Sequence, residues 1–348
     1  MTATRNPADA LTPAALAARI AALPRQPLAF LPTPLEACPR LSAALGGPDI
    51  FIKRDDLTGL AFGGNKTRQL EFVFAEALQA GADTIVAGAY TQSNWCRQIT
   101  AASCKLGLKP VLLLARGLKG DRLQGNLLLD RLMGAEIEIL DVMDEELQPF
   151  LEAKTRALRA AGRRPHLVSA FTVETQSLAA VGYVQAVLET NEQLAALGRE
   201  ADYFYVAGAE MSPAGLIVGT QALGGRTAVV SVSPVRYEQS RESEIARICN
   251  ATARRLRLDR TYVPADIVSD DSYIGERYGV MTAAAQEAMR LVARTEGIIL
   301  DPVYTAKAMS GLIGHIRSGR LRRGQTVVFF HTGGLPALFA YADDLDLA

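Results

Sequence analysis

The chain has 348 residues, and its 37 lysine and arginine residues balance 37 aspartate and glutamate residues, so the formal net charge is zero. Proteins that bind nucleic acid through its phosphates carry an excess of basic residues, so no nucleic-acid partner is expected. With 49% hydrophobic and 21% charged residues, the chain is too apolar to be disordered and is expected to be globular.

Export, membrane insertion and a metal site are not expected either. The N-terminus lacks a basic stretch followed by an apolar one, and no run of about 18 apolar residues occurs. The four cysteines and three histidines are scattered, without the spacing of a disulfide framework or a metal site. We therefore expect a cytoplasmic protein with no membrane or metal partner.

Short apolar segments alternate with longer helical patterns, which predicts an α/β fold with parallel sheets and flanking helices. The expected strands are 50–53, 84–87, 110–114, 136–140, 203–206, 228–232 and 326–330, and the expected helices are 69–80, 95–106, 145–161 and 178–197. The proline-rich first 45 residues are expected to form surface helices without a sheet core. The charged segment 236–278 is expected to form a solvated helical face.

The densest motif is the segment KRDDLTGLAFGGNKTR at residues 53–68, which delivers Lys66 between a glycine turn and a helix start. Such glycines let the backbone approach a ligand closely. Lys66 is either an exposed loop lysine or a nucleophilic amine whose pKa is lowered by desolvation or by Arg54 and Arg68. A phosphate-binding P-loop would need the lysine directly after Gly64, and Asn65 intervenes, so an NTPase is not expected.

Other predicted loops also follow strands and precede helices. Gln92, Ser93 and Asn94 crowd a helix start, where they either cap the helix or hold a carboxylate. The segment 206–215 is an ordinary loop or a phosphate site, although Glu210 would repel an anion. Toward the C-terminus, residues 278–279, 301–305 and 331–334 fit either buried structural positions or loops of a site.

In this order, the segments KRDDLTGLAFGGNKTR, QSN, DPVYTAKAM and HTGG resemble the D-cysteine desulfhydrase and 1-aminocyclopropane-1-carboxylate deaminase family. These are fold-type II pyridoxal-phosphate enzymes, and the resemblance runs from about Pro32 to Tyr341. It implies a two-domain fold like that of the tryptophan synthase β subunit, a pyridoxal 5'-phosphate cofactor, a small amino-acid substrate and a homodimer. The expected domains are a large cofactor-binding domain, 1–64 and 176–348, and a small mobile domain, 65–175.

The resemblance also implies roles for individual residues. The expected catalytic residues are Lys66, which would bind the cofactor covalently, with Ser93, Tyr278 and Tyr304. The expected cofactor-binding residues are Asn65, Lys66, Asn94, Gly208, Ala209, Ser212, Thr305 and Thr332, the two threonines lying near the pyridine ring. The expected substrate-binding residues are Gln92, Ser93, Asn94, Tyr278 and Tyr304.

The substrate is predicted from the residue after Tyr304. Deaminases of the cyclopropane type resemble DPVYEGK, with a glutamate that keeps the pyridine nitrogen protonated, whereas this chain has Thr305. A hydroxyl favours loss of a β-substituent over ring opening. The sequence therefore favours a D-cysteine desulfhydrase-like lyase that converts a small β-substituted amino acid to an α-keto acid and ammonia. A 1-aminocyclopropane-1-carboxylate deaminase and a catalytically silent ligand-binding relative remain alternatives.

The chain also departs from the family pattern at its expected phosphate site. Gln69 stands where relatives carry a lysine, and Glu210 lies in a loop that is rich in glycine and threonine in relatives. Both changes predict weaker or differently built phosphate binding. Near the expected substrate, Tyr90, Trp95 and Glu174 differ from the usual residues, which favours a polar or larger β-substituent over plain cysteine.

Overall fold

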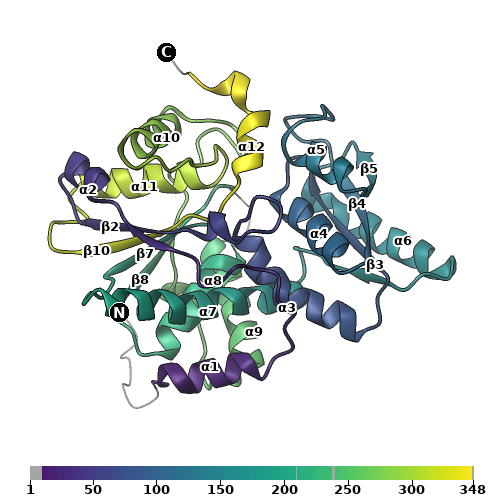
Figure 1. Cartoon of the computed structure of the whole chain (residues 1–348), viewed down its shortest axis with the longest axis horizontal. Coiled ribbons are helices and arrows are strands. Elements are labelled where there is room, and N and C mark those ends of the chain that lie inside the picture. The colour runs from purple at the N-terminus through teal and green to yellow at the C-terminus, as the bar shows by residue number, and fades with distance from the viewer. Residues whose placement is uncertain (1–9, 209, 237–239, 347–348) are drawn as a thin grey trace.

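The computed structural model describes residues 10–208, 210–236 and 240–346, which form two lobes, each built on its own sheet (Figure 1). The larger sheet has six strands in the order β1-β2-β10-β7-β8-β9. They are β1 (Leu35–Ala37), β2 (Asp49–Lys53), β7 (Tyr203–Ala207), β8 (Ala228–Val232), β9 (Val268–Asp270) and β10 (Thr326–Phe330). All neighbours in this sheet are parallel except β1 and β2.

Helices cover both faces of the larger sheet. On β10, Val327 and Phe329 pack in one apolar cluster, and Val328 and Phe330 pack in another, because successive side chains of a strand point to opposite faces. The first cluster includes residues of α2 (Pro39–Leu45), α10 (Ala283–Glu296) and α11 (Thr305–Arg317). The second includes residues of α7 (Val173–Ala196), α8 (Met211–Ala222) and α9 (Arg241–Arg255). Burial on both faces explains why this strand is apolar throughout.

The smaller sheet is built in the same way, with four parallel strands in the order β5-β4-β3-β6. They are β3 (Thr84–Tyr90), β4 (Lys109–Ala115), β5 (Glu136–Leu140) and β6 (Pro165–Leu167). Leu112 and Leu114 pack with α4 (Asn94–Lys105) and α5 (Gly125–Leu132), and Val111 and Leu113 pack with α6 (Leu147–Ala160).

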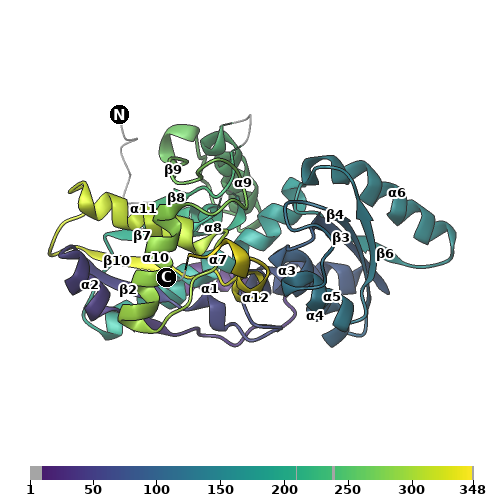
Figure 2. The same ribbon diagram turned by 90° about the horizontal axis from the view of Figure 1, so that it is seen from above.

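The helix α3 (Asn65–Gln79) lies between the lobes, which stand side by side in Figure 2. Its residues Leu70, Phe72 and Phe74 belong to an apolar cluster that contains residues from both sheets. The start of this helix is therefore held by the core of the whole molecule. We propose that the two lobes correspond to the two predicted domains, whose boundaries remain a prediction.

The predicted α/β class with flanking helices is confirmed, and each of the seven expected strands is present. The sequence missed β1, β6 and β9, which have three residues each, because such short strands are decided by neighbouring strands more than by propensity. β1 lies within the first 45 residues, where no sheet was expected, and it forms an edge of the larger sheet.

The remaining elements are short. They are α1 (Pro13–Ala21), α12 (Leu335–Ala340), and the 3₁₀ turns η2 (Asp55–Leu57), η3 (Asp144–Glu146), η4 (Pro264–Asp266) and η5 (Ala342–Asp344). Among the described residues, no helix combines the length and the apolar character needed to cross a bilayer.

Candidate active site

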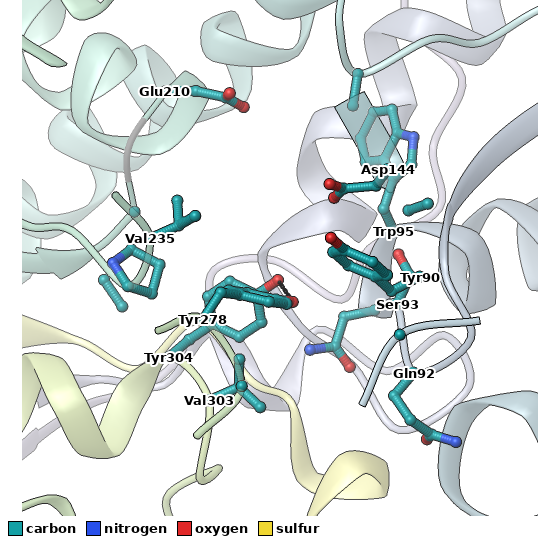
Figure 3. Close-up of a pocket in the computed structure, with 18 of the residues that line it drawn as sticks. Tyr90, Gln92, Ser93, Trp95, Asp144, Glu210, Val235, Tyr278, Val303 and Tyr304 are labelled. Atoms are coloured by element: carbon teal, nitrogen blue, oxygen red, sulfur yellow. Dashed lines mark hydrogen bonds between the residues drawn. The ribbon is translucent and has the colours of Figure 1, made fainter. Parts of the chain in front are cut away.

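A cavity of about 570 Å³ lies where loops from the two lobes meet, and Figure 3 shows part of its wall. The larger sheet contributes the loops after β7, β8 and β10, and the smaller sheet those after β3, β4 and β5. The carboxyl ends of parallel strands are the usual place for ligands in such folds, and this volume is typical of small-molecule sites. The topology therefore brings loops far apart in the sequence to one cavity.

Lys66 is the second residue of α3 and lines this cavity, as the sequence predicts. The glycine turn before it is required by close packing. Gly63 has a φ of 65°, and a Cβ there would lie 2.0 Å from the carbonyl oxygen of Asp56. The backbone N–H of Asn65 donates to the carbonyl of Thr332 at 2.9 Å. The backbone before Lys66 is thus fixed against the loop that follows β10.

The environment of Lys66 favours a neutral amine. Burial lowers its pKa to about 8, and the carboxylate of Glu210 partly opposes this shift. A substantial fraction of the amine is therefore uncharged just above neutral pH. An uncharged lysine amine is a nucleophile and can also accept a proton.

Of the two causes that the sequence left open for a low pKa of Lys66, desolvation is confirmed, and Arg54 and Arg68 are not among the causes. The guanidinium of Arg54 pairs with Asp56 at 2.7 Å, and that of Arg68 pairs with Asp55 at 2.7 Å inside the protein. Arg68 is fully buried. Residues two apart on a helix project in nearly opposite directions, so Arg68 and Lys66 point to opposite sides of α3. Lys66 thus faces the cavity while Arg68 faces the core.

The loop after β3 places three predicted residues in the cavity wall. The Oγ of Ser93 accepts a hydrogen bond from the N–H of Cys96 at 3.2 Å, so Ser93 caps α4 and also lines the cavity. Asn94 lines it too, at the first turn of α4. The amide of Gln92 donates to the carbonyl of Gln124 at 3.0 Å, and in Figure 3 it points away from the tyrosines. Gln92 therefore holds a loop of the small lobe.

A pair of tyrosines forms the opposite wall. The hydroxyls of Tyr278 and Tyr304 lie 2.6 Å apart, and the ring of Tyr90 stacks on Tyr278 with centroids 5.7 Å apart (Figure 3). Burial raises the pKa of both hydroxyls well above the usual value, so both carry a proton at neutral pH. Because only one proton is used in their mutual hydrogen bond, the other can be donated to a ligand.

The start of α8 forms the end of the cavity beside Lys66. Gly208, Glu210 and Ser212 line it, as does Thr332, whereas Ala209 lies outside the described residues. The Oγ of Ser212 accepts hydrogen bonds from the side-chain amides of Asn65 and Gln69, both at 3.0 Å. The partial positive charge of a helix N-terminus favours an anion at this position.

Thr305 is not among the described residues that line the cavity. It is the first residue of α11 and is buried, and its Oγ lies 2.6 Å from Oδ1 of Asp301. The same Asp301 oxygen accepts a hydrogen bond from the backbone N–H of Thr305 at 2.7 Å, so the Thr305 hydroxyl donates its hydrogen bond to this carboxylate. The structure therefore brings together the other described residues of the predicted site and leaves Thr305 behind its wall.

Sequence reasoning missed several wall residues, above all Asp144 at the start of η3, with Lys119, Phe171 and Tyr341. Burial, and then the neighbouring Glu145, raises the pKa of Asp144. The position of Asp144, four residues after the predicted strand 136–140, could have indicated that it lies in a loop at the carboxyl end of the sheet. Acidic loop residues are usually solvated, so this signal was weak.

Comparison with known proteins places this chain in a family. The profile of a family described as "Pyridoxal-phosphate dependent enzyme" matches residues 27–333, which is most of the chain. The chain belongs to this family. Two curated relatives are named 1-aminocyclopropane-1-carboxylate deaminase. One, from Burkholderia vietnamiensis, is 39% identical over 92% of this chain and 97% of its own length. The other, from Burkholderia cenocepacia, is 40% identical over 91% of this chain and 96% of its own length.

Solved structures agree with this assignment. A crystal structure described as an ACC deaminase homologue has a TM-score of 0.84 and 34% identity, and covers 94% of this chain and 97% of that one. A fungal L-serine ammonia-lyase from Rhizomucor miehei has a TM-score of 0.64 at 18% identity, and the match covers 92% of this chain and 100% of that one. At this identity the likeness supports the fold alone. The protein is therefore a pyridoxal-phosphate-dependent enzyme with the predicted fold.

The residues of the cavity fit this cofactor. Lys66 offers a partly neutral amine to its aldehyde, and the start of α8, with Gly208 and Ser212, offers a helix N-terminus to its phosphate. Asn65 and Thr332 line the same cavity. Glu210, the residue directly before α8, does not suit an anion at this position.

Proposed function

We propose that this enzyme is a deaminase of 1-aminocyclopropane-1-carboxylate, which it converts to 2-oxobutanoate and ammonia. The observation that carries the proposal is the 39–40% identity, over more than nine-tenths of the chain, to relatives that bear this name. The position of Thr305 behind the cavity wall weakens the preference for β-elimination that the sequence suggested. From the family resemblance we also propose that the enzyme is a cytoplasmic homodimer.

Different residues of the cavity bind the substrate carboxylate and transfer protons. Ser93 and Asn94 present the N-terminus of α4, which attracts the substrate carboxylate. The amine of Lys66 can take up a proton and return it, because its pKa of about 8 is close to neutral pH. The paired hydroxyls of Tyr278 and Tyr304 can donate a proton at the far wall. When bound, pyridoxal phosphate supplies an electron sink for the bonds broken at the substrate's α-carbon.

A D-cysteine desulfhydrase-like β-elimination is the second candidate. The presence of Thr305 in place of the glutamate of cyclopropane-type deaminases favours it. Both reactions produce an α-keto acid and ammonia, and they differ in which bond of the substrate is broken.

A substrate panel decides between these candidates. We expect the purified enzyme, loaded with pyridoxal phosphate, to form 2-oxobutanoate and ammonia from 1-aminocyclopropane-1-carboxylate faster than it forms pyruvate from D-cysteine, L-cysteine or β-chloroalanine. Coupled assays for the two keto acids measure this, with heat-denatured enzyme as the blank. Pyruvate from D-cysteine with an intact cyclopropane would reverse the assignment. Inertness toward the whole panel would favour the silent relative.

Replacing Tyr304 by phenylalanine tests the proton donor. We expect Tyr304→Phe to lower kcat by about 10²-fold or more, because a positioned acid contributes at least this much. The visible absorption of the bound cofactor should persist, since the removed hydroxyl contacts Tyr278 and not Lys66. Tyr203→Phe, outside the cavity wall, is the matched control. Full activity of Tyr304→Phe would remove this residue from the chemistry.

A further inference from the structure

Glu210 places a carboxylate at the end of the cavity where an anion is expected. It is the residue directly before α8, its side chain makes no capping hydrogen bond, and Figure 3 shows its carboxylate on the side opposite Gln92. Within the described residues, no hydrogen bond or ion pair of this carboxylate is found that would use its charge in the fold. The side chain is thus available to whatever occupies the cavity.

Glu210 and Lys66 lie at the starts of two helices, α8 and α3, that contact each other. Ser212, two residues after Glu210, is bonded at 3.0 Å to Asn65, which directly precedes Lys66. Both residues line the same cavity, and the charge of each stabilises the charged form of the other. In the cofactor-free protein, Glu210 therefore acts as a counter-charge of the Lys66 ammonium through space, without a direct ion pair between the two side chains.

The other charged groups around Glu210 come from neighbouring elements. Arg241, Glu244 and Arg247 of α9 act on the charge of Glu210. Glu174 at the start of α7 acts on Arg247, and Arg236 in the loop after β8 lines the same cavity. Arg247 is held by Glu244 and donates to Gln176 at 2.9 Å, which limits its ability to neutralise Glu210. Burial raises the pKa of Glu210, so its carboxylate is already disposed to accept a proton.

Pyridoxal phosphate changes this balance in two ways. Bound through Lys66, its aldehyde would replace the free ammonium whose charge stabilises the Glu210 carboxylate. Its phosphate, held at the start of α8, would bring up to two negative charges beside the carboxylate. We propose that Glu210 takes up a proton when the phosphate group arrives, so that the advantage of pyridoxal phosphate over pyridoxal falls as the pH rises.

The sign follows from proton counting. With pyridoxal, which has no phosphate, Glu210 stays ionised; with pyridoxal phosphate it is protonated. The phosphate-bearing form therefore binds one more proton at Glu210, and its relative affinity falls by up to ten-fold for each pH unit above neutrality. Because both compounds react with Lys66 through the same aldehyde, the chemistry of the lysine cancels from this ratio.

The test measures the dissociation constants of both compounds for the cofactor-free, full-length enzyme, by absorbance titration from pH 6 to pH 9. We expect the dissociation constant of pyridoxal divided by that of pyridoxal phosphate to fall with pH in the wild type. In Glu210→Gln this ratio should stay nearly level above pH 7, and the variant should bind pyridoxal phosphate about ten-fold tighter than the wild type at pH 8. Glu276→Gln, an exposed carboxylate at the cavity margin, is the control and should follow the wild type.

A second measurement needs no cofactor. The rate at which acetic anhydride modifies Lys66, followed by mass spectrometry as a function of pH, reports the pKa of this amine. Removing its counter-charge in Glu210→Gln should lower that pKa below the wild-type value of about 8. An unchanged pKa, a level ratio in the wild type, or the same pH slope in Glu210→Gln would overturn the proposal. None of these readouts involves substrate, so failure to open 1-aminocyclopropane-1-carboxylate would affect the proposed function alone.

Discussion

Replacing Lys66 by alanine is expected to remove the visible absorption of the enzyme with pyridoxal phosphate and to lower turnover by about 10³-fold or more. In the proposed mechanism, the variant loses both the nucleophilic amine that binds the cofactor covalently and the group that transfers the substrate's proton. In the wild type, burial makes this amine reactive near neutral pH by lowering its pKa to about 8. An absorption spectrum of each protein after addition of cofactor and gel filtration measures the first effect.

Two controls make this result specific to Lys66. Lys66→Arg keeps a positive charge in the cavity but has no nucleophilic amine at neutral pH, so it should also be colourless. Lys105→Ala removes an exposed lysine at the end of α4 and should behave as the wild type. A visible band that survives gel filtration in Lys66→Ala would show that another lysine binds the cofactor.

The second large effect is expected for the stability of the fold. Arg68→Leu should lower the free energy of unfolding by about 3–5 kcal/mol, because it leaves buried carboxylates without their cation. The guanidinium of Arg68 pairs with Asp55 at 2.7 Å and with Glu189 at 3.2 Å, and both its side chain and that of Asp55 are fully buried. Urea denaturation followed by circular dichroism measures the loss.

Arg199→Leu is the matched control, since it breaks an arginine–carboxylate pair with Asp49 in which both side chains are about half exposed. Exposed pairs contribute about 0–1 kcal/mol, so this variant should unfold close to the wild-type midpoint. Combining Arg68→Leu with Asp55→Asn should recover part of the loss, because the uncompensated charge is then removed. Equal stability of Arg68→Leu and Arg199→Leu would contradict the structural role of the buried network.

Local patterns in the sequence were sufficient for the fold class and for much of the site. Long apolar strands such as 110–114 and 326–330 are buried on both faces, so their composition alone identifies them. The glycine turn before Lys66 is equally local, because Gly63 is required by contacts with its own loop. The resemblance to the family added the cofactor, which the match to residues 27–333 confirms.

The tertiary structure decided the direction in which side chains of known position point. In the sequence Arg68 is only two residues from Lys66, yet the helix turns Arg68 into the core and away from the cavity. Thr305 directly follows Tyr304, but its hydroxyl faces Asp301 while the hydroxyl of Tyr304 faces Tyr278. Such orientations depend on the start of a helix and on what packs behind it, which no local pattern records.

The tertiary structure also decided the electrostatics of the site. The sequence left open whether desolvation or nearby arginines would lower the pKa of Lys66. Burial between two lobes causes the shift, and this burial depends on chain segments more than 100 residues apart. Asp144 and Glu210 come to the same cavity from loops after β5 and β7. Because their charges act through space and not along the chain, only the folded structure shows that both line the same cavity.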